Sequence, residues 1–243
     1  MDRFAFVIPV FNHSETISEV VKQAQQTGYP VFVVDDGSTD NTPEILKNLT
    51  GITLLCHSQN RGKGAALQTG FKEAAKIARW AITVDADGQH NPQEALNLVQ
   101  AIPTGERPIV IGRRQGMDCA NTPWTSQFGR SFSNFWIRAA GGHRVLDSQS
   151  GFRMYPMPET LELDPKTKRF QFEVEILVLA KWKGIPLIEA PVQVQYDPPG
   201  KRVSHFRPFV DFWRNAGTFS RLITRRMFVP RAVRSQLRKE PEA

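Results

Sequence analysis

The sequence has few cysteines and no long apolar run. Cys56 and Cys119 are the only two cysteines in 243 residues and form no motif with each other, which favours free thiols in a reducing compartment. No apolar stretch approaches the roughly 18–20 residues that a membrane-spanning helix needs. The amino-terminal stretch FAFVIPVF has the pattern of a strand, without the charged leader of a signal peptide. We therefore expect a cytoplasmic protein with no signal peptide and no transmembrane helix.

Two common nucleotide-binding signatures are also absent. The sequence has no P-loop lysine motif, and it has no GxGxxG fingerprint after a strand. These absences remove the support for an NTPase and for a dinucleotide-dependent enzyme.

Positive charge is concentrated near the carboxyl terminus. Between Lys201 and Lys239 the chain has eleven Lys and Arg and a single acid, Asp211, a balance of +10. The other residues carry 20 basic and 23 acidic side chains, or −3, so this segment accounts for the net charge of +7. Residues 206–243 read as a basic, aromatic, amphipathic helical segment with a tail. We expect it to lie on an anionic membrane surface, to pack on the core, or to do both with opposite faces.

Strand and helix signals alternate along the first 115 residues. Apolar strand runs without polar alternation, separated by helical patterns, predict an α/β fold: a mostly parallel, twisted sheet with helices on both faces. The rhythm changes at residue 116, where a basic, aromatic helix begins a second half that extends to residue 205. We expect 1–115 and 116–205 to be the two halves of one catalytic domain.

Three polar clusters follow buried strands in the first half: PVFNHSE, VVDDGSTDNT and VDADGQH. Each alone is consistent with a solvated turn, because Asp, Gly and Ser favour turns. Three at the carboxyl ends of parallel strands predict a shared ligand site at one edge of the sheet. Asp85 and Asp87 lie two residues apart and point to the same side of an extended chain, where they repel each other unless a cation or hydrogen-bond donors lie between them. With an oxygen from Gln89, they offer hard ligands for Mg²⁺ or Mn²⁺.

The glycine-rich stretch NRGKGAALQTG begins a helix. One interpretation places Lys63 and the backbone N–H groups near a phosphate. The other explains the glycines by close packing of the helix on the sheet and leaves Lys63 on the surface.

These motifs, followed by GRR and DSQSGFR, resemble family 2 glycosyltransferases over roughly residues 4–205. Within that family the chain looks most like the polyprenyl-phosphate glycosyltransferases, such as dolichyl-phosphate mannosyltransferases. The resemblance implies the GT-A fold and inversion at the sugar. It implies a nucleotide-sugar site formed by Pro9, Asn12, Glu15, Asp35, Asp36, Lys63, Asp85 and Arg202, and a metal held by Asp85, Asp87 and Gln89. The chain departs from the pattern at His13, where many relatives have Glu, and at His205, which replaces a lysine in the Arg202/Ser204 loop.

The second half is expected to receive the acceptor. The resemblance implies that Arg130, Ser133, Asn134 and Arg153 bind an acceptor phosphate, whose oxygens suit the fork of a guanidinium. The alternative is that the arginines lie on the surface of an amphipathic helix. Glu173 and Glu175, in FEVEI, either act as a general base for a hydroxyl acceptor or order the acceptor loop. The catalytic set that we predict is Asp87, Arg153 and Glu175.

The expected activity is metal-dependent, inverting transfer of a sugar from a nucleotide diphosphate sugar, of the GDP-mannose or UDP-hexose type. The expected acceptor is lipid-linked, a polyprenyl phosphate at the cytoplasmic membrane face. The alternatives are transfer to a hydroxyl of a glycolipid, another lipid or a polysaccharide, and a non-catalytic protein that binds nucleotide sugar or nucleic acid. The acidic clusters argue against nucleic acid. Self-association through the aromatic carboxyl-terminal segment is left open.

Overall fold

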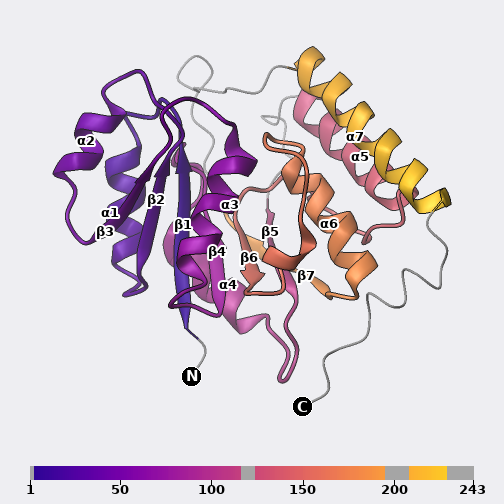
Figure 1. Cartoon of the computed structure of the whole chain (residues 1–243). Coiled ribbons are helices and arrows are strands. Elements are labelled where there is room, and N and C mark those ends of the chain that lie inside the picture. Colours follow the sequence, from indigo (N-terminus) through magenta and orange to yellow (C-terminus); the bar gives the residue numbers. More distant parts are fainter. Residues whose placement is uncertain (1–2, 116–123, 195–207, 229–243) are drawn as a thin grey trace.

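The apolar strand runs of both halves join one sheet (Figure 1). The computed structural model describes residues 3–115, 124–194 and 208–228. Arg202, Ser204 and His205 therefore lie outside the described residues, as does Cys119. The strands are β1 (Phe4–Val10), β2 (Val31–Asp35), β3 (Ile52–Cys56), β4 (Trp80–Thr83), β5 (Ile109–Arg114), β6 (Arg153–Pro156) and β7 (Leu187–Val192).

Helices cover both faces of this sheet, as the sequence predicts. Around the described strands lie α1 (Ile17–Gln25), α2 (Thr42–Asn48), α3 (Lys63–Ala74), α4 (Ala95–Gln100), α5 (Trp124–Ala139), α6 (Phe172–Lys183) and α7 (Pro208–Phe228), with short 3₁₀ helices η1 (Pro92–Glu94) and η2 (Leu161–Leu163). One core cluster contains side chains from α1, α2 and α4, and the other contains side chains from α3, α5, α6 and α7. The architecture is three layers, helix–sheet–helix.

Strand β1 shows why the strands read as continuous apolar runs. Ala5 and Val7 belong to the core cluster on the α3 side, whereas Phe6, Ile8 and Val10 belong to the cluster on the α1 side. All five are at most 2% exposed. Because side chains alternate between the two faces of a strand, a strand covered on both faces needs apolar residues at every position.

The strand order is β3-β2-β1-β4-β6-β5-β7 across the described sheet. β1 lies between β2 and β4 and is parallel to both, so the carboxyl ends of these three strands are neighbours. Strand β6 runs antiparallel to both β4 and β5. The sheet is therefore mostly parallel, with one reversed strand inside its second half.

The carboxyl-terminal helix α7 packs beside α5 and α6 rather than directly on the sheet (Figure 1). Its Phe219 and Leu222 are buried in the core, while Arg225, Arg226 and the last two residues of the helix are exposed. The inward face of α7 therefore packs on the core, one of the two roles expected for this part of the chain. No helix in the described ranges combines the length and the apolar character needed to cross a bilayer.

We predict that Gly70→Ala destabilises the protein. A Cβ at Gly70 would lie 2.3 Å from Cγ1 of Val7, so α3 would have to move away from β1. Overpacking of this kind costs about 1–3 kcal/mol, although alanine is intrinsically better in a helix than glycine. Gly217→Ala is the matched control, because a Cβ at this position in α7 has nothing within 4 Å. Urea unfolding should show a loss only at Gly70; equal stability of the two variants would contradict the packing.

Candidate functional site

The loops that follow β1, β2 and β4 lie together at one edge of the sheet, as the three polar clusters predict. The side-chain oxygen of Asn12, after β1, accepts a hydrogen bond from the Thr39 backbone amide at 2.7 Å. The backbone amide of Asn12 donates to Ser38 Oγ at 3.0 Å. Thr16 Oγ1 donates to the Ala86 carbonyl at 2.5 Å. The β1 loop is thus fastened to the loops on both sides of it. Asn12 itself has a φ of +55°, which asparagine tolerates better than most residues.

Asp36 holds the glycine-rich stretch in place through hydrogen bonds. Its buried carboxylate accepts hydrogen bonds from the backbone amides of Arg61, at 2.9 Å, and Gly62, at 2.7 Å, and it contacts His57 Nδ1 at 2.6 Å. The other ring nitrogen of His57 is 3.0 Å from Thr69 Oγ1. The oxygens of Asp36 hold the loop that begins α3, and the nucleotide contact expected of Asp36 stays a prediction. Asp35 also has a local partner, the Ser38 amide at 3.0 Å.

Lys63 lies between two carboxylates from different halves of the chain. Its Nζ is 2.6 Å from Asp85 Oδ1 and 2.8 Å from Glu173 Oε1. Burial by itself would lower the pKa of Lys63, but the two carboxylates outweigh it and hold that pKa above its ordinary value. Burial would likewise raise the pKa of Asp85, and the Lys63 ammonium instead lowers it. Lys63 and Asp85 are therefore both charged at neutral pH.

The loop after β4 turns at Gly88, whose φ is +75°. Asp87 Oδ1 accepts from the Gln89 amide at 3.1 Å, and Asp87 is half-buried while Gln89 is buried. Asp85 presses against Gly151, where a Cβ would lie 2.1 Å from Oδ2 of Asp85. Only glycine leaves room for the carboxylate there, so the DSQSGF segment forms a wall of the acidic site.

His90 ends the acidic loop and was not among the predicted site residues. Its ring lies 5.4 Å from that of Phe152, and its Nδ1 is buried without a hydrogen-bond partner. Burial lowers the pKa of His90 to about 4, which outweighs the opposite effect of Asp85. The imidazole is therefore neutral at physiological pH.

The first of the predicted acceptor residues hold the 146–149 segment in place. Ser133 Oγ accepts from Gln149 Nε2 at 3.3 Å, and Asn134 bonds the Leu146 carbonyl, at 2.9 Å, and the Ser148 amide, at 3.3 Å. Arg130 belongs to the same helix, α5, but its side chain is outside the described ones. Helix α5 therefore positions the segment that leads to Gly151.

Arg153, predicted to bind the acceptor phosphate, lies at the start of β6, and that contact stays a prediction. Its side chain is buried and donates to the carbonyls of Ser150 at 2.7 Å, Ser148 at 2.7 Å and Glu173 at 2.8 Å. An acceptor phosphate could reach this guanidinium only after these bonds had broken. The geometry makes Arg153 a support for the DSQSGF segment and for the start of α6.

Comparison with known proteins identifies this arrangement. The sequence model of glycosyl transferase family 2 matches residues 5–158, more than half of the chain. The chain belongs to glycosyl transferase family 2. It is a glycosyltransferase, and the family resemblance read from its motifs is confirmed.

Two relatives show how far the sequence similarity to this glycosyltransferase extends. The UDP-N-acetylglucosamine–dolichyl-phosphate N-acetylglucosaminyltransferase of Methanococcus voltae is 32% identical, over 78% of this chain and 84% of the relative. The polyprenol monophosphomannose synthase of Mycolicibacterium smegmatis is 26% identical, over 78% of this chain and 76% of the relative.

Solved structures confirm the GT-A fold. TarS of S. aureus, residues 1–349, aligns with 97% of this chain and 69% of its own at a TM-score of 0.59 and 16% identity. GalNAc-T7, solved with UDP, GalNAc and Mn²⁺, aligns with 92% of this chain and 48% of its own at a TM-score of 0.56 and 14% identity. At these identities the likeness concerns the fold alone.

The two glutamates of FEVEI have different surroundings in this glycosyltransferase. Glu173 faces the acidic site through Lys63, whereas Glu175 is 2% exposed and points to the other side of α6. The Glu175 carboxylate accepts from the Thr167 amide at 2.8 Å, the Lys166 amide at 3.1 Å and Arg221 Nη2 at 2.6 Å. Its oxygens are already engaged, so Glu175 orders the loop before α6, one of the two roles that the sequence left open.

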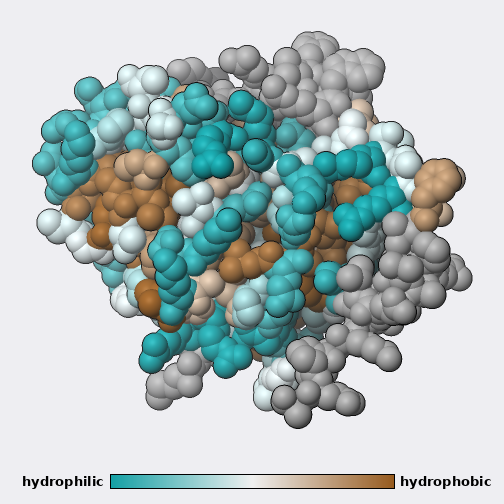
Figure 2. Space-filling view, in the orientation of Figure 1, coloured by the Kyte–Doolittle hydropathy of each residue, from teal (hydrophilic) through white to brown (hydrophobic). Residues whose placement is uncertain are grey.

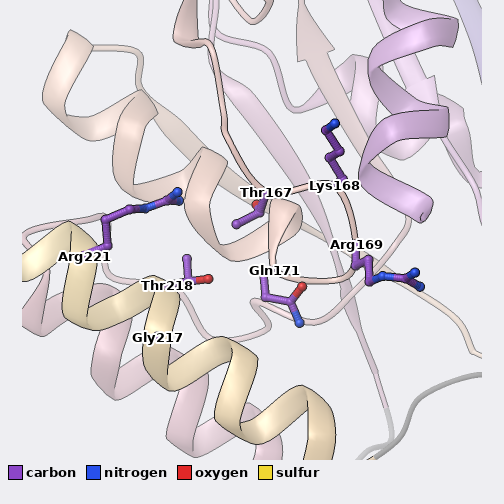
Figure 3. Close-up of a pocket in the computed structure, with 7 residues that line it drawn as sticks. All are labelled: Thr167, Lys168, Arg169, Gln171, Gly217, Thr218 and Arg221. Carbon is purple, nitrogen blue, oxygen red and sulfur yellow. The ribbon is translucent and has the colours of Figure 1, made fainter. Parts of the chain in front are cut away.

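A cavity of about 380 Å³ lies beside this loop (Figure 3). It is lined by Thr167, Lys168, Arg169, Gln171, Gly217, Thr218 and Arg221. In Figure 3 Arg221 extends from α7 toward the start of α6, while Lys168 and Arg169 point away from α7. No carboxylate of the β2 or β4 loops lines the cavity, so it is separate from the acidic edge.

We predict that Glu175→Gln lowers the free energy of unfolding by about 1–3 kcal/mol, because a neutral amide replaces a buried carboxylate that binds Arg221 and two backbone amides. Urea unfolding measures the loss. Glu162→Gln is the control, since Glu162 is exposed on η2. A Glu175→Gln variant with unchanged stability but no sugar transfer would instead make Glu175 a general base.

Proposed function

We propose that this glycosyltransferase moves a sugar from a nucleoside diphosphate sugar to a polyprenyl-phosphate acceptor, with inversion and with the help of a divalent metal ion. The observation that carries the proposal is the acidic loop after β4, which lies beside the β1 and β2 loops and against Gly151. The names of the relatives from M. voltae and M. smegmatis support the acceptor class. The name of the M. voltae relative also supports a nucleoside diphosphate sugar as the donor.

The residues of the β4 loop fit a small, hard cation. Asp85 is already in contact with one cation, the Lys63 ammonium, and its side chain is 29% exposed. Within the described ranges, no set of three or more His, Cys, Asp or Glu side chains forms a metal site. Mg²⁺ and Mn²⁺ in nucleotide sites need only one or two protein carboxylates, because phosphates and water complete the shell. Asp85 and Asp87 would supply these, with an oxygen of Gln89, and the ion would offset charge developing on the leaving diphosphate.

The remaining donor residues surround the same edge. Asn12, after β1, is hydrogen-bonded to the β2 loop, and Glu15, three residues further on, is exposed. We assign direct donor contacts to this β1 loop and to the β4 loop. Asp36 acts indirectly, since its carboxylate holds the Arg61 and Gly62 amides.

The state of the glutamates favours a phosphate acceptor over a hydroxyl. A hydroxyl needs a general base, whereas a phosphate monoester is already ionised near neutral pH. Glu175 is engaged by four hydrogen bonds, and Glu173 is paired with the Lys63 ammonium. Both carboxylates are therefore engaged in contacts within the protein. An acceptor phosphate oxygen would attack the anomeric carbon opposite the diphosphate, forming one C–O bond as the other breaks.

The outer face of α7 suits an anionic membrane surface. Met227 and Phe228 are 73% and 78% exposed, next to the exposed Arg225 and Arg226. Hydrophobic atoms appear at this end of α7, at the right-hand edge of Figure 2. Cations beside exposed apolar side chains are the composition of an interfacial helix. We propose that α7 holds the enzyme at the cytoplasmic membrane face, where a lipid-linked acceptor is available.

Asp87→Asn tests the metal role. We expect the release of nucleoside diphosphate with a polyprenyl phosphate and Mn²⁺ to fall at least about 100-fold, without loss of thermal stability. EDTA should abolish the wild-type reaction reversibly. Asp164→Asn is the control, because Asp164 is exposed and distant in the chain from the acidic loop. Full activity of Asp87→Asn in excess EDTA would refute the metal.

Arg130→Ala tests the acceptor side. The loss of a guanidinium near the acceptor phosphate should raise the KM for polyprenyl phosphate about tenfold and leave the donor KM nearly unchanged. Arg138→Ala, at an exposed position of the same helix, is the matched control. Steady-state kinetics with each substrate varied in turn measure both constants. Equal effects on the two constants would argue against a phosphate contact at Arg130.

A further inference from the structure

Lys63 contacts Asp85, one of the residues proposed above to hold the metal. The two groups that it joins are far apart in the chain: Asp85 follows β4, and Glu173 lies in the first turn of α6. All three side chains are at least two-thirds buried, with exposures of 14% for Lys63, 29% for Asp85 and 10% for Glu173. The ammonium therefore lies between two partly desolvated carboxylates and contacts both.

Lys63 and a metal ion would compete for the carboxylate of Asp85. A divalent ion on Asp85 and an ammonium 2.6 Å from the same carboxylate repel each other at close range. The other oxygen, Oδ2, faces Gly151, which leaves little space for the carboxylate to turn away. A metal bound to Asp85 must therefore weaken or break the Lys63 contact. Lys63 does not become unpaired when this happens, because Glu173 remains 2.8 Å away.

We propose that Lys63 is a built-in competitor for the metal, which makes metal binding depend on the donor. This inference rests on the metal role proposed above. The protein alone binds the ion weakly, since the ion has to displace a positive charge. The diphosphate of the donor adds negative charge at the same place, which offsets the repulsion between the ion and the ammonium. Metal and nucleotide consequently bind with positive coupling, and Lys63 is a positioning residue that sets the strength of this coupling.

The test is Mn²⁺ binding to the full-length protein, measured by electron paramagnetic resonance with no nucleotide and again with UDP or GDP. Lys63→Met should bind Mn²⁺ about tenfold more tightly than wild type without nucleotide, and should gain less from the nucleotide. In EDTA the same variant should melt at a lower temperature, because Asp85 and Glu173 have lost their counter-ion. Lys72→Met, at an exposed position of α3, should match wild type in all three measurements.

Glu173→Gln should change Mn²⁺ affinity in the opposite direction. Without the second carboxylate, displaced Lys63 has no partner, so this variant should bind Mn²⁺ several-fold more weakly than wild type without nucleotide. It also serves if Lys63→Met fails to fold. Affinity unchanged or weaker in Lys63→Met, or unchanged in Glu173→Gln, would overturn the competitor role.

The same measurements distinguish failure of the competitor role of Lys63 from failure of the proposed metal role. If Asp87→Asn loses Mn²⁺ while Lys63→Met binds it as wild type does, only the competitor role fails. If wild type binds no Mn²⁺ with either nucleotide, the metal role fails and the competitor role fails with it.

Discussion

The structure of the site depends on the repulsion between carboxylates that the fold brings together. Asp85 and Glu173 come from opposite halves of the chain, and one ammonium satisfies both. Partly buried carboxylates without a counter-charge take up protons or force the surrounding structure apart. Lys63 is thus an electrostatic link between the donor half and the acceptor half. It also fixes where α3 begins relative to α6.

Several charged residues that the family resemblance predicts to bind substrate or to act in catalysis bind backbone groups in this structure. Asp36 holds the amides of the glycine-rich stretch, Arg153 holds carbonyls of the DSQSGF segment, and Glu175 holds the loop before α6. Charge-assisted hydrogen bonds of this kind are strong and directional. Loops that lack regular structure are therefore fixed by three buried charges.

The sequence was sufficient for the layers, the sheet edge and the family, because these follow from local patterns. Apolar runs such as FAFVIPV, separated by helical patterns, are typical of strands covered on both faces, and polar clusters that follow parallel strands meet at the carboxyl edge of the sheet. The partners of individual charges could not be predicted. Glu173 contacts Lys63, whereas Glu175 contacts Arg221. Nothing in FEVEI distinguishes the two glutamates, because they lie two positions apart in the same buried turn of α6. That difference arises from long-range packing of α3 and α7 on α6.

The reversed direction of β6 has a consequence for how the site is assembled. Arg153, at the beginning of β6, pairs with Thr83, at the end of β4, so the residues that precede β6 reach the same edge as the residues that follow β4. The chain therefore delivers DSQSGF to the acidic loop on its way into the sheet, and leaves the sheet at the opposite rim. Insertions after Pro156 would lengthen that far rim and leave the acidic loop undisturbed. Insertions of equal size before Arg153 would push directly into it.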